Sequence, residues 1–81
     1  MITFKFHSNG ITVGIEKIRE NLAKAIAFRL MHMITTKITH LIDEIQIKDE
    51  EPIIVVDLND GSVSISNTSE ELKIKITEAL K

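Results

Sequence analysis

The sequence predicts one α+β domain, in which two antiparallel β-hairpins form one sheet, with a long central helix and a short C-terminal helix. Asn9-Gly10 and Asp60-Gly61 each separate two segments in which apolar and polar residues alternate, the pattern of a half-buried hairpin. Between the two hairpins the apolar spacing changes to the period of a helix. The predicted order is ββα–ββα, in a single domain over residues 1–81.

The first hairpin is predicted around Asn9-Gly10, because both central residues of a tight type I′ turn need a positive φ. Ile2, Phe4 and Phe6 alternate with polar residues before the turn. The expected cross-strand pairs are Ser8 with Ile11, Phe6 with Val13 and Phe4 with Ile15. This register places the large apolar residues of both strands on one face.

A long helix is predicted over residues 15–47, since no Gly or Pro lies between Gly14 and Pro52. The segment carries two apolar stripes, rotated from each other by roughly 100–120°. The first stripe is Ile15, Ile18, Leu22, Ile26 and Met33, and the second is Leu30, Ile34, Ile38, Leu41 and Ile45. Two interpretations remain open: one long helix, which we favour, or two helices broken near Thr35-Thr36, where β-branched residues weaken helical preference. A continuous helix of this size is about 45 Å long, more than the remaining chain can cover, which predicts a homo-oligomer, with a dimer as the simplest form.

The last third of the chain predicts a second hairpin and a helix. With Asp60-Gly61 as a two-residue loop, Leu58 faces Val63 and Val56 faces Ile65. Thr68-Ser69-Glu70-Glu71 has the pattern of a capping box at a helix N-terminus. The expected helix covers residues 69–80 and has Leu72, Ile76 and Leu80 on one stripe, with Ala79 beside them.

No catalytic or metal-binding constellation is recognisable, so we expect a non-enzymatic protein without a cofactor. The chain has no cysteine, which excludes thiolate metal sites and disulfides. His32 and His40 are two helical turns apart, about 12 Å, too far to bind one zinc ion together. The carboxylates of residues 49–51 adjoin a proline in a linker, where such runs are usually solvated.

The charge is unevenly distributed, although the whole chain has a net charge of only −2. Residues 1–48 carry seven Lys or Arg against four Asp or Glu, and residues 49–81 carry three against eight. A basic first half is compatible with nucleic-acid binding. The candidate residues for that contact are Lys17 and Lys24, which share a helical face, although Glu16 and Glu20 dilute it.

The helix centre supplies the candidates for a protein interface, because Arg29 and His32 interrupt a segment that is otherwise apolar nearly all round. An unpaired charge is costly to bury, and Arg is enriched at interface hot spots. The interface candidates are Arg29, Met31, His32 and Met33. The expected function is a small binding or regulatory module that acts through protein–protein contacts as a homo-oligomer. The alternative is a nucleic-acid-binding regulator.

The expected location is the cytoplasm, without a membrane contact. The N-terminus lacks the pattern of a signal peptide. The longest nearly apolar stretch, residues 25–34, is far shorter than the ~20 residues of a membrane span.

Overall fold

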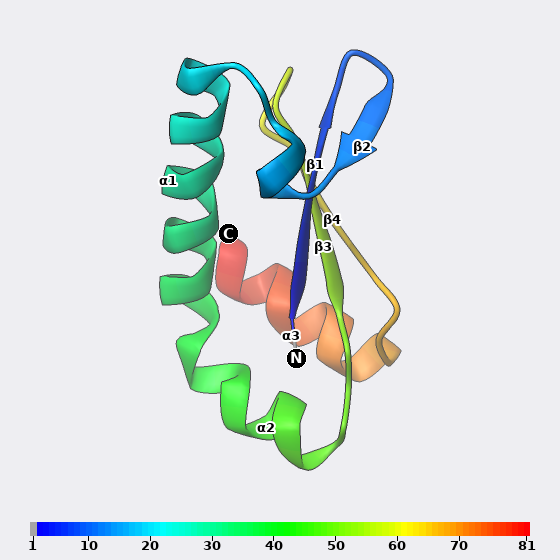
Figure 1. Ribbon diagram of the computed structural model, residues 1–81. Helices are drawn as coiled ribbons and strands as arrows, with labels where there is room; N and C mark the ends of the chain where they lie inside the picture. Colours follow the sequence, from blue (N-terminus) through cyan, green and yellow to red (C-terminus); the bar gives the residue numbers. More distant parts are fainter. Residues whose placement is uncertain (1) are drawn as a thin grey trace.

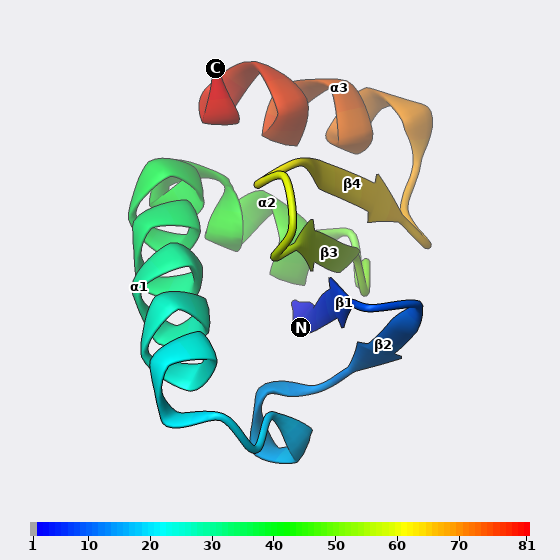
Figure 2. The same ribbon diagram turned by 90° about the horizontal axis from the view of Figure 1, so that it is seen from above.

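A computed structural model describes residues 2–81 and shows two layers, a four-stranded mixed β-sheet and a set of helices on one of its faces (Figures 1 and 2). The elements in chain order are β1 (Thr3–Ser8), β2 (Ile11–Val13), the 3-10 turn η1 (Ile15–Lys17), α1 (Asn21–Ile38), the 3-10 turn η2 (Thr39–Leu41), α2 (Ile42–Ile47), β3 (Ile53–Asp57), β4 (Val63–Ser66) and α3 (Glu70–Leu80). The strand order is β2-β1-β3-β4, with β1 and β3 parallel at the centre and each hairpin partner antiparallel outside them. The predicted α+β class is confirmed.

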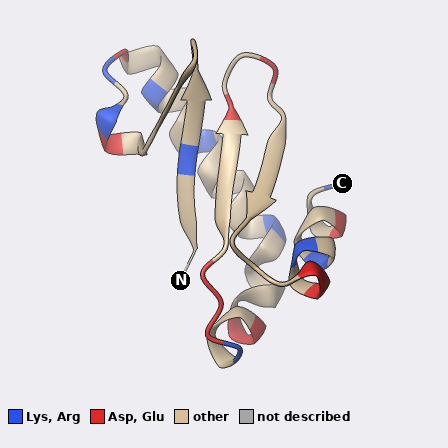
Figure 3. Ribbon diagram, turned by 90° about the vertical axis from the view of Figure 1, so that its right-hand side faces the viewer, with Lys and Arg blue, Asp and Glu red and all other residues tan. Residues whose placement is uncertain are grey.

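The core lies between the sheet and the helices. Its fully buried side chains are Phe6, Ala27, Ile38, Ile45, Ile54, Val56, Leu72 and Ile76. Because side chains alternate along a strand, the odd-numbered residues of β1 and β3 lie on the opposite face, which no helix covers (Figure 3). Cross-strand pairing there puts Lys5, Val55 and Ser64 in one row.

The first hairpin forms around Asn9-Gly10 as predicted. Asn9 has φ of 52° and Gly10 has φ of 80°, which is the left-handed backbone that this turn requires. Phe6 pairs with Val13 and Ser8 with Ile11, so the predicted register is confirmed near the turn. The third expected pair, Phe4 with Ile15, is wrong, because β2 ends at Val13 and Ile15 starts η1.

The second hairpin forms, but its predicted register is wrong by two residues. Val56 pairs with Val63 and Ile54 with Ile65, so the loop is wider than Asp60-Gly61. Only Gly61 has a positive φ in this loop, whereas a type I′ turn needs two such residues. Side chains stabilise the wider loop instead: Asn59 N–H donates to Asp57 Oδ1 and Ser62 N–H donates to Asp60 Oδ1, both at 2.8 Å. Because side chains alternate along a strand, a slip of two residues leaves the same side chains of β4 facing the core.

The central helix is shorter than predicted and bent. It begins at Asn21 instead of residue 15, because Ile18 and Glu20 have extended backbones. The bend lies at η2, Thr39–Leu41, a few residues beyond the expected break at Thr35-Thr36.

Hydroxyl groups and burial account for the position of the bend. Thr35 and Thr39 donate side-chain hydrogen bonds to the carbonyls four residues earlier, contacts that often bend helices. The bend turns Ile34, Leu41 and Ile45 toward the same core. The continuous rod of about 45 Å is therefore absent, and the whole molecule is 36 Å in its longest dimension.

The C-terminal helix α3 lies beside β4 at one edge of the sheet and packs against the end of α1 (Figures 2 and 3). Leu72 and Ile76 are fully buried, which confirms the predicted stripe. The N-cap is Ser69, whose Oγ accepts a 3.3 Å hydrogen bond from Leu72 N–H. The predicted capping box at Thr68–Glu71 is wrong: the cap lies one residue later, where the third helical residue is Leu72 and has no side-chain acceptor to return.

The acceptor that completes this cap comes from elsewhere in the chain. Glu50 Oε1 accepts hydrogen bonds from Ser69 N–H at 2.8 Å and from Thr68 Oγ1 at 2.5 Å. These bonds, led by the one from Thr68, lower the pKa of Glu50 from its ordinary value of 4.5. Glu50 therefore does what the third helical residue does in a capping box. The expectation that the whole run 49–51 is simply solvated is wrong at this position.

We expect Glu50→Gln to lower the melting temperature at neutral pH and to flatten the loss of stability on acidification. Folding lowers the pKa of Glu50, so its contribution is complete above about pH 4.5 and is lost as pH falls through the lower pKa of the folded state. Thermal unfolding from about pH 3 to 7 measures both effects. Glu51→Gln, at the exposed neighbouring side chain, is the control. Equal pH curves for the two variants would contradict this role.

Candidate protein-binding surface

One side of α1 carries apolar side chains that the fold does not bury. Leu22 is 66% exposed, and Ile26 and Met33 are each 46% exposed. They lie ~100–140° around the helix from the buried Ala27. Of the first predicted stripe, only Ile15 and Ile18 contact the core, and both lie outside the helix. The second stripe faces the core, so it is buried, whereas the helical part of the first stripe is exposed.

These exposed residues form one wall of a groove, which we name the α1–hairpin groove, and the β3–β4 hairpin forms the other wall. The groove has one pocket of about 150 Å³ beside Leu22, Ile26 and Leu58. A second pocket of about 160 Å³ lies nearer the C-terminal end of α1, beside Met33 and Val63. The apolar residues that define the groove are Leu22, Ile26, Leu30 and Met33 of α1, and Leu58 and Val63 of the hairpin.

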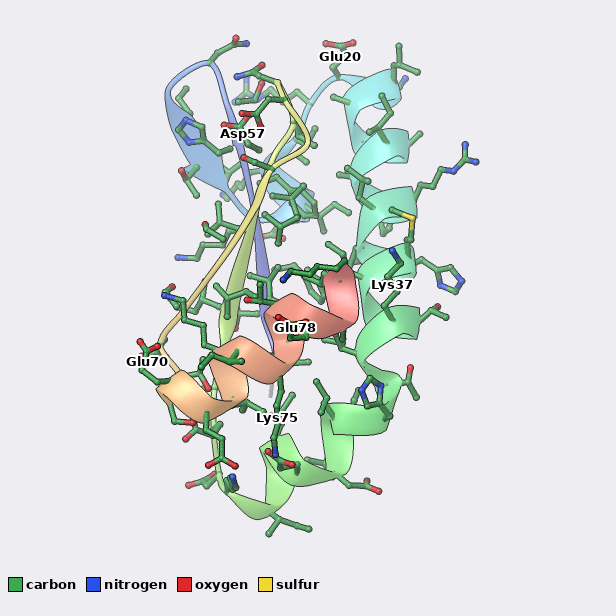
Figure 4. The ribbon with its side chains drawn as sticks, turned by 180° about the vertical axis from the view of Figure 1, so that it is seen from behind. Glu20, Lys37, Asp57, Glu70, Lys75 and Glu78 are labelled. Carbon is green, nitrogen blue, oxygen red and sulfur yellow. The ribbon has the colours of Figure 1, made fainter. Side chains whose placement is uncertain are left out.

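The groove is open because the helices cover only part of the sheet. Seen from behind, α3 crosses the lower half of the space between the hairpin and α1, and no other helix lies in front of the upper half (Figure 4). Leu80, at the end of α3, lines the lower pocket and closes the groove there. Each Å² of apolar surface left in water forgoes about 25 cal/mol of stabilisation. A contiguous apolar surface of this kind is typical of an interaction site.

Charged residues of opposite sign lie at the two ends of the groove. Glu20 lines its upper pocket and Lys37 its lower pocket, and Figure 4 labels both along α1. Arg29 is exposed between them. The rims of the groove are therefore polar and its floor is apolar, the usual anatomy of a protein interface.

The four interface candidates from the sequence do not form one surface. Met33 lines the groove, and Arg29 is exposed beside it. Met31 is half-buried and packs against the core. His32 is exposed about 100° from Met33 around the helix. Sequence reasoning recognised Leu22 and Ile26 as a stripe but not as a surface, although two rotated stripes on one helix already indicate that one core cannot cover both.

The nucleic-acid candidates lie near the start of α1 without forming a basic patch. Lys17 is exposed in η1 and Lys24 is half-buried in the first turns of α1. Acidic and basic residues alternate in this region (Figure 3). The three Phe residues face the core or lie on α1, so the uncovered face of the sheet has no aromatic platform on which bases could stack.

The strongest electrostatic cluster joins α2 to α3. Lys75 Nζ lies 2.9 Å from Glu44 Oε1, and Lys48 and Glu71 complete the group. The hydrogen bond from Lys75 lowers the pKa of Glu44, and the same bond raises the pKa of Lys75. Both shifts favour the charged forms of an exposed ion pair, which holds two helices together. They do not prepare an acid or a base for catalysis.

Within residues 2–81, no three His, Asp or Glu side chains converge in a way that could bind a metal ion. The same residues include no helix with the length and hydrophobicity needed to cross a bilayer. His7 Nδ1 lies 2.7 Å from Thr12 Oγ1 across the first hairpin, an ordinary cross-strand contact.

Two isoleucines on α1 test which stripe belongs to the core. We expect Ile34→Ala to reduce the free energy of unfolding by about 2–5 kcal/mol, because it leaves a cavity. Ile26→Ala should change it by about 0.5 kcal/mol or less, as at other surface positions. Urea unfolding at low protein concentration measures both. An equal cost at the two positions would show that Ile26 is also core.

Comparison with known proteins identifies no relative. No protein-family model matches the chain, and no curated protein or solved structure is significantly similar to it.

Proposed function

We propose that this protein is a non-enzymatic binding module that acts as a homodimer, with the α1–hairpin groove as its interface. The observation that carries this proposal is the exposed apolar stripe Leu22, Ile26 and Met33 facing Leu58 and Val63 across an open groove. Without cysteine the chain has no disulfide to stabilise a small core, and association with a second copy is one of the remaining means.

A two-fold dimer explains how a single groove can serve both partners. In such an interface the same surface of each copy is self-complementary. Glu20 and Lys37 are about 25 Å apart along α1. An antiparallel pairing of two α1 helices, centred near residues 28–29, places Glu20 of each copy beside Lys37 of the other. Met33 then falls between Leu22 and Ile26 of the partner.

This pairing also agrees with the polarity of the helices. In an antiparallel pair the positive N-terminal end of one helix lies beside the negative C-terminal end of the other. The two Glu20–Lys37 contacts lie at the rims, where charges set orientation more than affinity. Affinity then comes from the apolar residues between them, as at most interfaces.

The mass in solution tests the proposal. We expect wild type to have twice its 9.1 kDa chain mass at about 100 µM by size-exclusion chromatography with light scattering. Ile26→Asp should raise the dimer dissociation constant at least tenfold, since it places a charge in an apolar interface. Ala25→Asp, at an exposed residue about 100° from Ile26 around α1 that lines neither pocket of the groove, should not. A monomeric wild type, or equal effects of the two variants, would refute the proposal.

A charge exchange tests the antiparallel arrangement. Glu20→Lys and Lys37→Glu should each weaken the dimer, because each places like charges together. The double variant should restore the association of wild type, and high salt should reduce all three differences. Weakening without restoration would refute this pairing while leaving the groove as the interface. Salt-sensitive binding of duplex DNA that Lys17 and Lys24 control would favour the nucleic-acid alternative instead.

A further inference from the structure

The free part of the β1 edge is a second unpartnered surface, far around the molecule from the α1–hairpin groove. β2 pairs with β1 only at Phe6–Ser8, so the edge beside Thr3–Lys5 has no neighbouring strand within residues 2–81 (Figure 1). An open sheet edge offers backbone donors and acceptors to another chain.

The hydrogen-bond phase of β1 shows which groups the open edge offers. Thr3 N–H donates to Pro52 C=O at 3.0 Å, and His7 C=O accepts a hydrogen bond from Leu58 N–H at 2.8 Å. The odd-numbered residues of β1 therefore bond toward β3, and the even-numbered residues bond toward the β2 side. Phe6 meets Val13 there. Phe4 directs its N–H and C=O to the same side, where β2 has already ended.

An apolar pocket lies directly beside this edge, between β1 and the bent helix. Its volume is about 240 Å³, and its lining comes from β1 and the residue before it, the end of α1, and α2, without any residue of β3 or β4. The lining residues are Ile2, Phe4, Thr35, Ile42, Ile45 and Gln46. Thr35 lies on the opposite side of α1 from Ile26, almost in line with Phe28, which is 50% exposed.

A free sheet edge beside a helix, with an apolar pocket between them, fits an extended peptide. A strand in the track of β2 would pair with Phe4 through its backbone and place every second side chain in the pocket. A helix could not satisfy both backbone groups of Phe4. The β1 strand of a second copy does not fit either, because its own β2 already occupies the same edge at Phe6–Ser8.

A basic side chain beside the edge favours acidic residues in the bound strand. Lys5 lies on the uncovered face of β1 and is exposed. Side chains of an added strand that point away from the pocket would lie on this face, and a carboxylate there would face Lys5. We propose that this protein binds an extended peptide, with apolar residues alternating with acidic ones, as an additional strand on the β1 edge. This site is independent of the proposed dimer interface.

A synthetic peptide and backbone NMR test the proposal. The probe is a capped hexapeptide in which glutamate alternates with valine and isoleucine, titrated into the ¹⁵N-labelled full chain. We expect saturable binding with a dissociation constant below about 1 mM. The largest shifts should fall on Phe4, Lys5, Thr35 and Gln46. No saturation, or shifts centred on the α1–hairpin groove, would overturn the proposal.

Peptide variants distinguish strand addition from other modes of binding. Methylating the backbone nitrogens one at a time should weaken binding at least fivefold at the position whose N–H pairs with Phe4 C=O, and little at its two neighbours, whose N–H groups point away from β1. A uniform effect along the peptide would contradict strand pairing. The same peptide with lysine in place of glutamate should bind several-fold more weakly. Equal binding of the two peptides would contradict the proposed contact between Lys5 and an acidic side chain.

Protein variants locate the pocket with a matched control. Thr35→Arg should weaken peptide binding at least tenfold by filling the pocket with a charged side chain. Thr36→Arg should change binding less than twofold, because Thr36 is exposed, makes the same kind of hydroxyl bond to the helix backbone and does not line the pocket. Gln46→Arg, at an exposed position on the pocket rim, gives a second test if Thr35→Arg destabilises the fold. Equal binding by Gln46→Arg and Thr36→Arg would refute the site.

Discussion

The parallel pairing of β1 with β3 constrains the rest of the molecule. Two neighbouring parallel strands need a connection that returns to the starting end of the sheet, usually through a helix. Here that connection is η1, α1, η2 and α2, which together occupy most of residues 15–47. Because it passes over one face only, the core forms on that face and the other face stays open to solvent (Figure 3).

The same crossover leaves the helical layer incomplete. α1 runs along one side of the sheet, and its bend places α2 at the lower end. α3, which follows β4, lies at the same lower end (Figures 1 and 4). Above α3 no further helix covers the space between α1 and the β3–β4 hairpin (Figure 4). Beside β1 the shortness of β2 leaves a free edge over the pocket at Phe4. Both proposed surfaces are thus places that the elements of residues 2–81 leave uncovered.

Polar contacts hold α3 to α2 and to the loop that follows α2. Glu50, in the loop after α2, caps the start of α3 at Ser69, and Lys75 of α3 pairs with Glu44 of α2. These contacts are exposed, so each contributes modestly. Their placement still matters, because they hold α3 against α2 at the end of the sheet where the core is most complete. The open groove lies at the other end, away from this network.

The sequence determined what depends on neighbours a few residues apart. Asn9-Gly10 specified its turn, alternation specified the strands, and the apolar stripe of Leu72 and Ile76 specified the last helix. For the binding surface, the sequence already contained the apolar stripe of Leu22, Ile26 and Met33, since helical period alone groups these residues.

The tertiary structure decided what depends on residues far apart in the chain. Neither β1 nor β3 encodes locally that the two strands pair in parallel. The register of the second hairpin followed the side-chain bonds in its loop, and the cap of α3 needed Glu50 from another loop. Two stripes on one helix were equally apolar, and only the position of the sheet and α3 determined that Ile34 is buried while Ile26 is exposed. Burial is a property of the assembled layers, so a local pattern can predict a face without predicting what covers it.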